Sequence, residues 1–412
     1  MKSSSACREK VATLRTEVQE VLENNILSFW LEQMQDHEHG GFYGQMTGRG
    51  ELVKTADKGA ILNARILWAF SAAYRVLRKP EYLEAATRAK DYILDHFIDP
   101  EYGGTYWSLD YLGQPRDTKK QFYAIGFMIY GRSEYARATG DHEALDVALQ
   151  LYECIEEHSL DHEYNGYIEA MTRDWQPIAD MRLSEKDENG VFTMNTHLHV
   201  LEAYTNLYRV LKNVQRDDVQ GTKERVERQL RTLIDIFATR IFDPATGHLM
   251  LFFDESWQPS NTHTSPGHDI EAAWLLHEAL EVFGDEELLN QTLPVIYSLA
   301  QAAEDGILRE SEWWCFAEAV VGYIDQWQLL LDEDPQEASI NYELAQAAYE
   351  FIQNRLLDRE HGEWFWSVLA DGTPDLTRDK SGFWKCPYHN SRMCFEMMER
   401  CAQRTKTATL KE

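Results

Sequence analysis

The sequence predicts an all-α protein, an (α/α)6 barrel in which six helical hairpins close into a toroid with short β-hairpin loops. One observation is a turn pattern that recurs as "DHEHGGFYG" (36–44), "DPEYGGTYW" (99–107), "DHEYNGYIE" (161–169), "DPATGHLML" (243–251) and "DREHGEWFW" (358–366), with a weaker echo, "EDGIL", at 304–308. The other is that apolar residues between these turns lie three and four apart, as in amphipathic helices. Turns recurring at roughly sixty residues indicate a repeat architecture.

The helical spacing covers twelve segments, which pair into six hairpins. In chain order they are 11–33, 57–77, 81–97, 118–138, 141–158, 193–212, 222–241, 266–283, 286–303, 313–330, 336–356 and 387–403. The glycine of each turn is expected to end a helix in a left-handed cap and to lead into a short extended piece. We expect the even-numbered helices to line the inside of one domain, residues 1–412. An open α-solenoid is the alternative.

Composition limits the partners of the protein. The formal net charge of −29 argues against nucleic acid and anionic membranes, which would repel the chain. The N-terminus lacks the apolar core of a signal peptide, and the six cysteines show no disulfide framework. We therefore expect a cytoplasmic protein. Because no obvious interface helix is left over once the barrel is built, we expect a monomer, with a weak homodimer as the alternative.

Two inner helices begin with the pattern Pro-x-His. Ser265 is a plausible cap for a helix that opens at Pro266, and His268 follows two residues later. The last helix is expected to begin at Pro387, again with a histidine, His389, two residues on. A helix N-terminus is electropositive and so favours neutral imidazole, which can accept a proton. The two histidines together indicate an acid–base pair.

Other inner helices also carry polar or aromatic residues near their starts. Residues three or four apart share a helix face, as do Asn195 with His199, His268 with Glu271, and Trp314 with Glu318. Arg65 is the one charge in an apolar helical run, which favours a position facing a polar cavity. An aromatic-rimmed pocket with several histidines and few lysines suits a neutral, hydroxyl-rich ligand such as a sugar.

No metal site is predicted. His197 and His199 lie two apart on a helix and cannot bind one metal ion, so His197 is expected to pack or to lie at the surface. Cys386, His389 and Cys394 have a loosely zinc-like spacing. A structural zinc site needs four ligands, and a fourth is not evident.

Five segments resemble those of cellobiose 2-epimerases, within the N-acylglucosamine 2-epimerase superfamily: "ADKGAILNARILWAF", "MNTHLHVLEAY", "GHDIEAAWLL", "WWCFAEAVVG" and "WKCPYHNSRM". The similarity runs from about residue 20 to 400. It implies an (α/α)6 barrel that epimerises the reducing-end sugar of cellobiose or mannobiose at C2 through a cis-enediolate, without a cofactor. It also implies that His268 and His389 are the acid–base pair and that Arg65 and His199 stabilise the intermediate. The implied sugar-site residues are Tyr123, Asn195, Glu271, Trp314, Glu318, Trp384 and Asp187.

Two departures from the family pattern leave the substrate open. Cys315 and Phe316 stand where members typically have valine and glutamine, and the segment "EDGILRESEWW" is shorter than expected. A shorter loop makes a mannose 2-epimerase or an aldose–ketose isomerase acting on free hexoses an alternative. An inverting glycosidase, which needs two carboxylates, would use Asp269, Glu271 or Glu318. A non-catalytic sugar-binding or protein-interaction solenoid is the remaining hypothesis.

Overall fold

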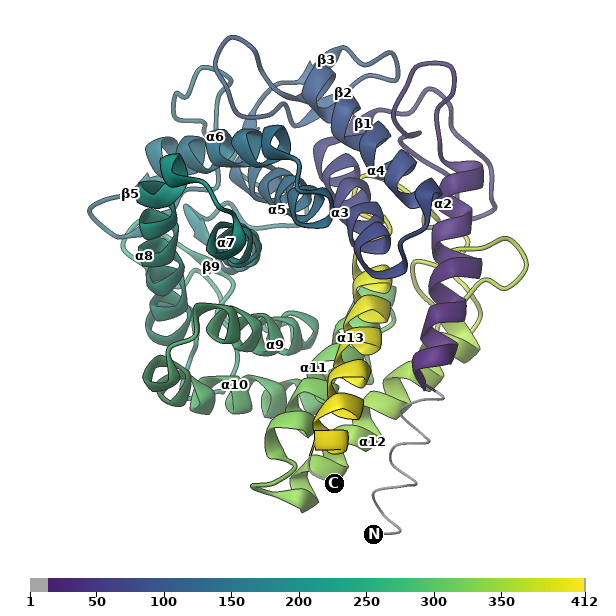
Figure 1. Cartoon of the computed structure of the whole chain (residues 1–412), viewed down its shortest axis with the longest axis vertical. Helices are drawn as coiled ribbons and strands as arrows, with labels where there is room; N and C mark the ends of the chain where they lie inside the picture. Colours follow the sequence, from purple (N-terminus) through teal and green to yellow (C-terminus); the bar gives the residue numbers. More distant parts are fainter. Residues whose placement is uncertain (1–13, 411–412) are drawn as a thin grey trace.

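The structure is a computed structural model that describes residues 14–410, with the side chains of 14–400. Residues 11–13 of the first expected helix lie outside the described residues. Figure 1 shows a ring of inner helices surrounded by outer helices. The inner helices are α3 (Ala60–Leu77), α5 (Phe122–Thr139), α7 (Met194–Asn213), α9 (Pro266–Phe283), α11 (Trp313–Leu330) and α13 (His389–Leu410). Each contacts the next and α13 contacts α3, so the ring closes, which confirms the barrel and argues against the open solenoid.

The outer helices alternate with the inner ones along the chain. They are α2 (Ser28–Gln33), α4 (Pro80–Tyr92), α6 (His142–His158), α8 (Gln220–Ile236), α10 (Glu286–Ile307) and α12 (Pro335–Phe351). Short π-helical segments precede α2 or extend other outer helices: η1 (Leu22–Leu27), η2 (Ile93–Phe97), η4 (Phe237–Ile241) and η5 (Ile352–Leu356); η3 (Asp217–Val219) is a 3-10 turn. Outer helices such as α8 bury one face, whereas inner helices such as α5 are buried nearly all round, as expected for a two-layer ring.

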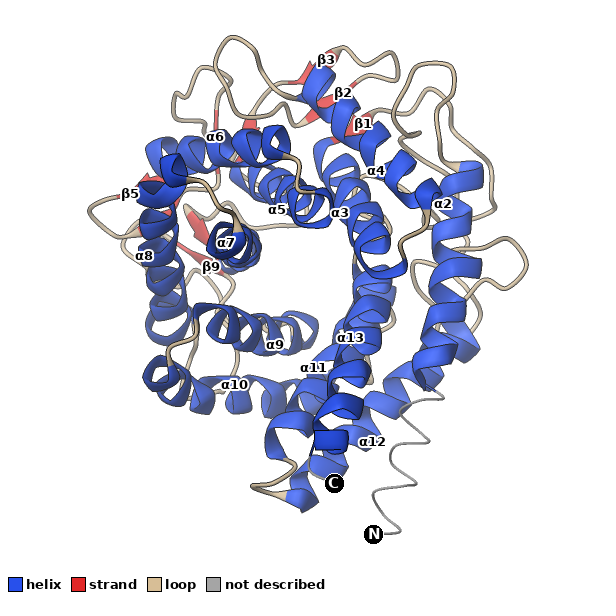
Figure 2. Cartoon of the chain, viewed as in Figure 1, coloured by secondary structure: helices blue, strands red, loops and turns tan. Residues whose placement is uncertain are grey.

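The strands are short and lie in the loops between helices (Figure 2). They are β1 (Lys58–Gly59), β2 (Ser108–Leu109), β3 (Pro115–Asp117), β4 (Lys120–Gln121), β5 (Leu160–Asp161), β6 (Gly166–Tyr167), β7 (Ala170–Met171), β8 (Phe192–Thr193) and β9 (Phe252–Phe253). Antiparallel pairing joins β1-β2-β3, β4-β7, β5-β6 and β8-β9. In the part of the chain that the structure describes, no helix combines the length and apolar character needed to cross a bilayer.

The five repeated turns fold into the same small hairpin. Bridges join Gln35 to Phe42, Ile98 to Thr105, Leu160 to Tyr167, Phe242 to Leu249 and Leu357 to Trp364. Asp36 accepts hydrogen bonds from the N–H groups of Glu38 and His39, and Gly40 takes a left-handed φ of 80°. The expectation that this glycine caps the helix is wrong, since α2 already ends at Gln33. The left-handed residue closes the hairpin instead.

The weaker echo at 304–308 is helical up to Ile307 and does not form a hairpin turn like the other five. Helix α10 continues to Ile307, so Gly306 lies within it. A Cβ atom at Gly306 would collide with the ring of Pro266 at the start of α9. This glycine therefore permits close packing of α10 against α9, which a local pattern does not distinguish from a turn signal.

A buried lysine fastens three of the hairpins to the segment that leads into the next inner helix. The pairs are Lys58 with Asp36, Lys120 with Asp99, and Lys380 with Asp358. Each lysine also donates to the carbonyl of a hairpin glycine. Lys58 and Lys120 lie in β1 and β4, directly before α3 and α5. These ion pairs thus help to set where the inner helices begin.

We predict that Lys58→Met lowers the free energy of unfolding by about 3–5 kcal/mol, because Asp36 is left as an unpaired buried charge. Urea unfolding followed by circular dichroism measures the change. Arg225→Met is the control, since Arg225 and Glu153 form an exposed ion pair that should contribute at most about 1 kcal/mol. Equal losses in the two variants would contradict the prediction.

Glu363 joins the two ends of the ring. Its carboxylate accepts hydrogen bonds from Trp30 in α2 (2.7 Å), Lys385 (2.8 Å) and Asn390 in α13 (2.6 Å). Glu363 itself has a left-handed φ of 62°, a conformation that these contacts hold in place. The buried Lys385 is therefore part of the closure of the ring.

Candidate active site

A cavity of about 190 Å³ lies among the starts of the inner helices. Its lining residues come from helices far apart in the sequence and from the loops between them. They are Arg65, Tyr123, Asn195, His199, His268, Glu271, Glu312, Trp313, Trp314, Trp366, Trp384 and His389. The structure thus brings together every predicted site residue except Glu318 and Asp187.

His268 lies in the first turn of α9, as expected. Pro266 is the first residue of the helix and Ser265 precedes it, but the Ser265 hydroxyl does not cap a backbone N–H group. Its Oγ lies 2.7 Å from Nδ1 of His268 instead. The indole of Trp314 packs against the imidazole, with ring centroids 4.8 Å apart. Ser265 therefore orients the His268 ring.

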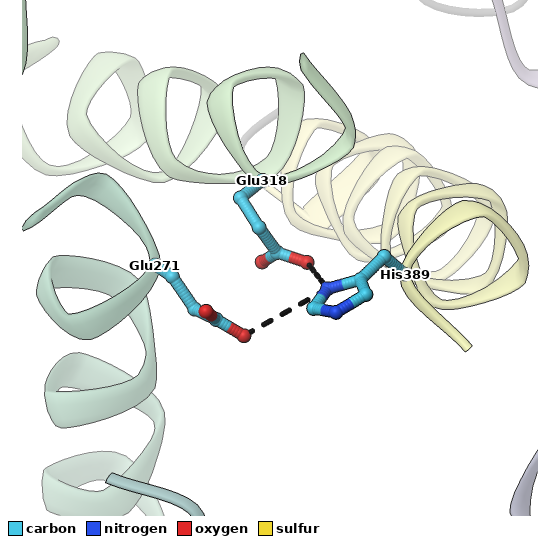
Figure 3. A group of neighbouring side chains, drawn as sticks. All are labelled: Glu271, Glu318 and His389. Carbon is cyan, nitrogen blue, oxygen red and sulfur yellow. Dashed lines mark hydrogen bonds and ion pairs between the residues drawn. The ribbon is translucent and has the colours of Figure 1, made fainter. Parts of the chain in front are cut away.

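His389 is the first residue of α13, so the prediction that this helix begins at Pro387 is wrong. The Tyr388 carbonyl accepts the first helical hydrogen bond, from the N–H of Arg392, which places Pro387 outside the helix. Nδ1 of His389 lies 2.6 Å from Oε1 of Glu318 (Figure 3). Glu318 thereby fixes the orientation of the His389 ring.

The two imidazoles face a common space. Trp314 in α11 has its ring centroid 4.8 Å from that of His268 and 5.7 Å from that of His389, so the imidazole centroids are at most about 10.5 Å apart. Helix α11 contacts both α9 and α13 and separates them in the ring. The two histidines thus approach the cavity from different walls.

Burial keeps the site imidazoles neutral near pH 7. Desolvation, with a further contribution from His199, lowers the pKa of His268 to about 3. Desolvation and the positive charge of Arg65 hold the pKa of His389 well below its ordinary value. The pKa of His199 is also lowered by burial, although Nδ1 lies 2.9 Å from Oε2 of Glu202. Each ring can therefore accept a proton.

Arg65 is a buried cation beside these rings. Its Nη2 donates to the hydroxyl of Tyr123 (2.9 Å), and its guanidinium lies 4.2 Å from the ring centroid of Phe127 and 4.4 Å from that of Tyr388. Nε has no hydrogen-bond partner, and no carboxylate pairs with Arg65 among residues 14–400. A buried, unpaired guanidinium is suited to meet an anionic group on a ligand.

Glu318 and Asp187 lie outside this cavity. Glu318 lies behind the wall, where it contacts His389 and accepts a hydrogen bond from Nε1 of Trp274 (2.9 Å). Asp187 lines a second cavity of about 190 Å³, which shares Asn195 and His268 with the first. Its carboxylate accepts hydrogen bonds from the Ser184 N–H and hydroxyl groups, both at 2.8 Å.

Glu271, Glu318 and His389 form a group whose ligand atoms all lie within 4.8 Å of one another (Figure 3). Nη2 of Arg392 lies 2.6 Å from Oε1 of Glu271 and 2.7 Å from Oε1 of Glu318. A metal ion bound there would have to displace this guanidinium, so the contacts favour an ion-pair cluster. That the protein works without a metal stays a prediction.

Comparison with known proteins identifies the family. The model of the N-acylglucosamine 2-epimerase family matches residues 41–303. A cellobiose 2-epimerase from Bacteroides fragilis is 52% identical over 402 residues, which cover 93% of this chain and 98% of that protein. The chain belongs to the cellobiose 2-epimerase family.

Solved structures of cellobiose 2-epimerases agree with this family. That from Spirochaeta thermophila has a TM-score of 0.87 at 35% identity and covers 97% of this chain and 99% of its own. That from Bacillus thermoamylovorans has a TM-score of 0.86 at 38% identity and covers 94% and 100%. The predicted resemblance is thereby confirmed.

Sequence reasoning about this member of the cellobiose 2-epimerase family missed several residues around the cavity. Glu312 and Trp366 line it, and Glu202, Tyr388 and Arg392 lie behind it. Two signals were available: Glu202 follows His199 by three residues and so shares its helix face, and Trp366 ends a repeated turn.

His197, two residues before His199, packs as expected. Its Nε2 accepts a hydrogen bond from the Tyr167 N–H at 2.9 Å, and its Nδ1 lies 2.7 Å from the carbonyl oxygen of Thr193. Both nitrogens of this buried ring are therefore occupied by the backbone.

Glu169 is a further buried acid, in the wall of the second cavity. The hydroxyls of Thr193 (2.6 Å) and Thr196 (2.9 Å) donate to it, and burial raises its pKa to about 8. The folded protein therefore holds this proton at pH values where an unfolded chain, with a glutamate pKa of 4.5, has released it. The stabilising contribution of Glu169 should therefore fall as the pH rises from about 5 to 8.

We predict that Glu169→Gln removes this pH-dependent contribution from the free energy of unfolding, because glutamine does not ionise. Urea unfolding of the wild type and of Glu169→Gln at pH 5, 6, 7 and 8 tests this prediction. The free energy of unfolding of the variant should increase relative to that of the wild type as the pH rises. A difference that stays constant with pH would refute the prediction.

Proposed function

We propose that the protein is a sugar 2-epimerase that interconverts the glucose and mannose configurations at C2 of the reducing-end residue of a β-1,4-linked disaccharide of the cellobiose or mannobiose type. The observation that carries this proposal is that His268 and His389 line one cavity from the non-adjacent helices α9 and α13. Membership of the cellobiose 2-epimerase family supports the same reaction.

The chemistry explains why two imidazoles are needed. The proton on C2 becomes removable only when the sugar ring opens and C1 is an aldehyde. One neutral imidazole removes that proton, which leaves a cis-enediolate and an imidazolium. The other ring, which has taken up a proton from water, donates it to the opposite face of C2, and exchange with water then restores both rings. Negative charge on the intermediate raises the proton affinity of the nearby rings, so an imidazolium can form despite the dry site.

The remaining cavity residues supply charge and hydrogen bonds. Arg65 would bind the oxygen on which the enediolate charge collects, since its Nε has no hydrogen-bond partner among the residues that the structure describes. His199, with Nδ1 bonded to Glu202, offers Nε2 to a sugar hydroxyl when neutral. Oδ1 of Asn195 is also buried without a partner and would accept a bond from a sugar hydroxyl. Tyr123, Glu271, Trp314 and Trp384 would line the sugar, and Asp187 would act from the adjoining cavity.

The geometry does not favour the inverting glycosidase. Such an enzyme places its two carboxyl groups about 6.5–9.5 Å apart, on opposite sides of the scissile bond. The nearest oxygens of Glu271 and Glu318 lie within 4.8 Å of each other and share Arg392. Asp269 instead accepts a hydrogen bond from the Leu249 N–H and does not line the cavity.

A free hexose is the alternative substrate. Helix α10 ends at Ile307 and α11 begins at Trp313, so only residues 308–312 connect them. Within this connection Glu312 lines the cavity and accepts a hydrogen bond from Nε1 of Trp314 at 3.0 Å. A connection this short favours a site that encloses one sugar ring and covers little of a second.

Proton NMR of the anomeric region tests the reaction and the substrate together. The protein is incubated with cellobiose, mannobiose and mannose in separate tubes, in deuterated water. Epimerisation gives the C2 epimer at unchanged mass apart from one deuterium at C2. Ketose signals would identify an isomerase, free monosaccharides from a disaccharide would identify a hydrolase, and no exchange with any sugar would overturn the proposal.

We further propose that the chain works as a single-domain monomer in the cytoplasm, without a cofactor. The ring closes within one chain, which supports a self-contained unit. Cys154, Cys315, Cys386 and Cys394 are free thiols, which suits a reducing compartment. Light scattering after gel filtration tests the monomer, and activity after dialysis against a chelator tests independence from metal.

A further inference from the structure

Arg392 lies one turn after His389 in α13 and is 1% exposed. Its Nη2 binds Glu271 in α9 and Glu318 in α11, and its Nη1 contacts Glu202 in α7. One guanidinium thus joins four inner helices directly behind the sugar cavity. Arg392 itself does not line that cavity.

Two of these three carboxylates hold site histidines. Glu318 contacts Nδ1 of His389 at 2.6 Å, and Glu202 contacts Nδ1 of His199 at 2.9 Å. Because the carboxylates occupy Nδ1, Nε2 is the nitrogen that each ring can offer to a substrate. The direction of both rings therefore depends on where the two carboxylates lie.

Arg392 is what keeps the carboxylates together. Three buried carboxylates without a cation would repel one another or take up protons, because the dry interior screens charge weakly. The guanidinium is itself held between rings, 4.2 Å from the centroid of Tyr388 and 4.8 Å from that of Trp274. The Tyr388 hydroxyl also donates to Glu202. The cluster thus has one defined arrangement.

We propose that Arg392 is a positioning residue for the epimerisation, which aligns His199 and His389 by fixing Glu202 and Glu318. This inference rests on the proposed function. Arg392 acts through the two carboxylates, so its loss should affect the chemical step more than sugar binding. Lysine cannot replace it fully, since a single ammonium cannot reproduce a planar fork that meets three carboxylates.

The expected result for Arg392→Lys is a fall in kcat of about 10–100-fold, with a smaller change in KM, because small misplacements of a reacting group slow reactions by such factors. Arg392→Gln should shift the pH–rate profile upward. The reason is that Arg392 lowers the pKa of both His389 and His199, so removing its charge lets both rings hold protons at higher pH.

Arg400→Lys is the matched control. Arg400 lies two turns later in the same helix and binds Asp325 (2.6 Å) and Glu396 (3.0 Å), away from the sugar cavity. Its replacement should lower the melting temperature but leave the pH–rate profile in place. Glu202→Gln provides a second test, in which Arg392 is kept. This variant should lower kcat as Arg392→Lys does, and it can be measured even if the Arg392 variants do not fold.

Wild-type protein is assayed first, by C2 exchange with cellobiose. An inactive wild type overturns the proposed function and this inference with it. An active wild type, together with Arg392 and Glu202 variants that fold and keep its kcat and pH profile, overturns the inference alone. Losses of kcat that exceed that of Arg400→Lys, with a displaced pH profile, support the positioning role.

Discussion

His389→Asn is expected to lower kcat for C2 epimerisation by about 10²–10⁴-fold, and His268→Asn should have an effect of the same size. Each variant retains one base, on one side of the sugar only. In deuterated water each should therefore still exchange the C2 proton of one epimer, without inversion, and should leave the other epimer unlabelled. The two variants should show opposite preferences, measured by proton NMR with the glucose- and mannose-configured sugars.

His277→Asn is the control for this pair. His277 is a buried histidine in the same helix as His268, but its Nδ1 contacts Asp325 at 2.8 Å and it lines a different cavity, near Arg400. This variant should lose stability and keep its kcat. Epimerisation within tenfold of wild type in both His268→Asn and His389→Asn would rule out the two-base mechanism.

Arg65→Met should lower kcat by about 10²–10³-fold, because the enediolate loses the Arg65 guanidinium from the cavity wall. The same change should leave the free energy of unfolding unchanged or increase it, since a buried cation without a carboxylate partner is replaced by an apolar side chain of similar length. Steady-state kinetics and urea unfolding of one preparation measure both effects.

Arg132→Met separates catalysis from the general effect of removing a buried charge. Arg132 lies in α5, away from the cavity, and its Nε and Nη1 have no hydrogen-bond partner among residues 14–400, as for Nε of Arg65. The Arg132→Met variant should be at least as stable as the wild type, as expected for Arg65→Met, but should retain full activity. If Arg65→Met kept the wild-type kcat, or if Arg65→Met and Arg132→Met lost activity equally, the prediction that Arg65 stabilises the enediolate would be wrong.

The architecture could be predicted from the sequence because each ring helix buries a continuous face, which the apolar spacing records. Some helix boundaries could not be predicted. The sequence around Gly306 resembles a turn, whereas its packing against Pro266 is visible only when α9 and α10 are placed side by side. Likewise, Pro387 resembles a helix start, but Tyr388 accepts the first helical hydrogen bond.

The residues that line the cavity were predicted better than the buried residues behind them. His268, His389 and Arg65 stand out in the sequence because each is a polar residue near the start of an inner helix. Arg392 and Glu202 are equally polar, yet their part in the site depends on carboxylates from other helices meeting at one point. Sequence spacing within one helix does not contain that information.

The closure of the ring through Glu363 bears on how the protein is made. A ribosome releases α2 long before α13, so Trp30 must wait for more than 350 further residues before its partner network with Lys385 and Asn390 can form. Since His389 is the neighbour of Asn390, the wall of the sugar cavity is completed only after this stretch has emerged. A nascent or prematurely terminated chain should therefore be unable to process sugar, however many of its earlier hairpins have already folded.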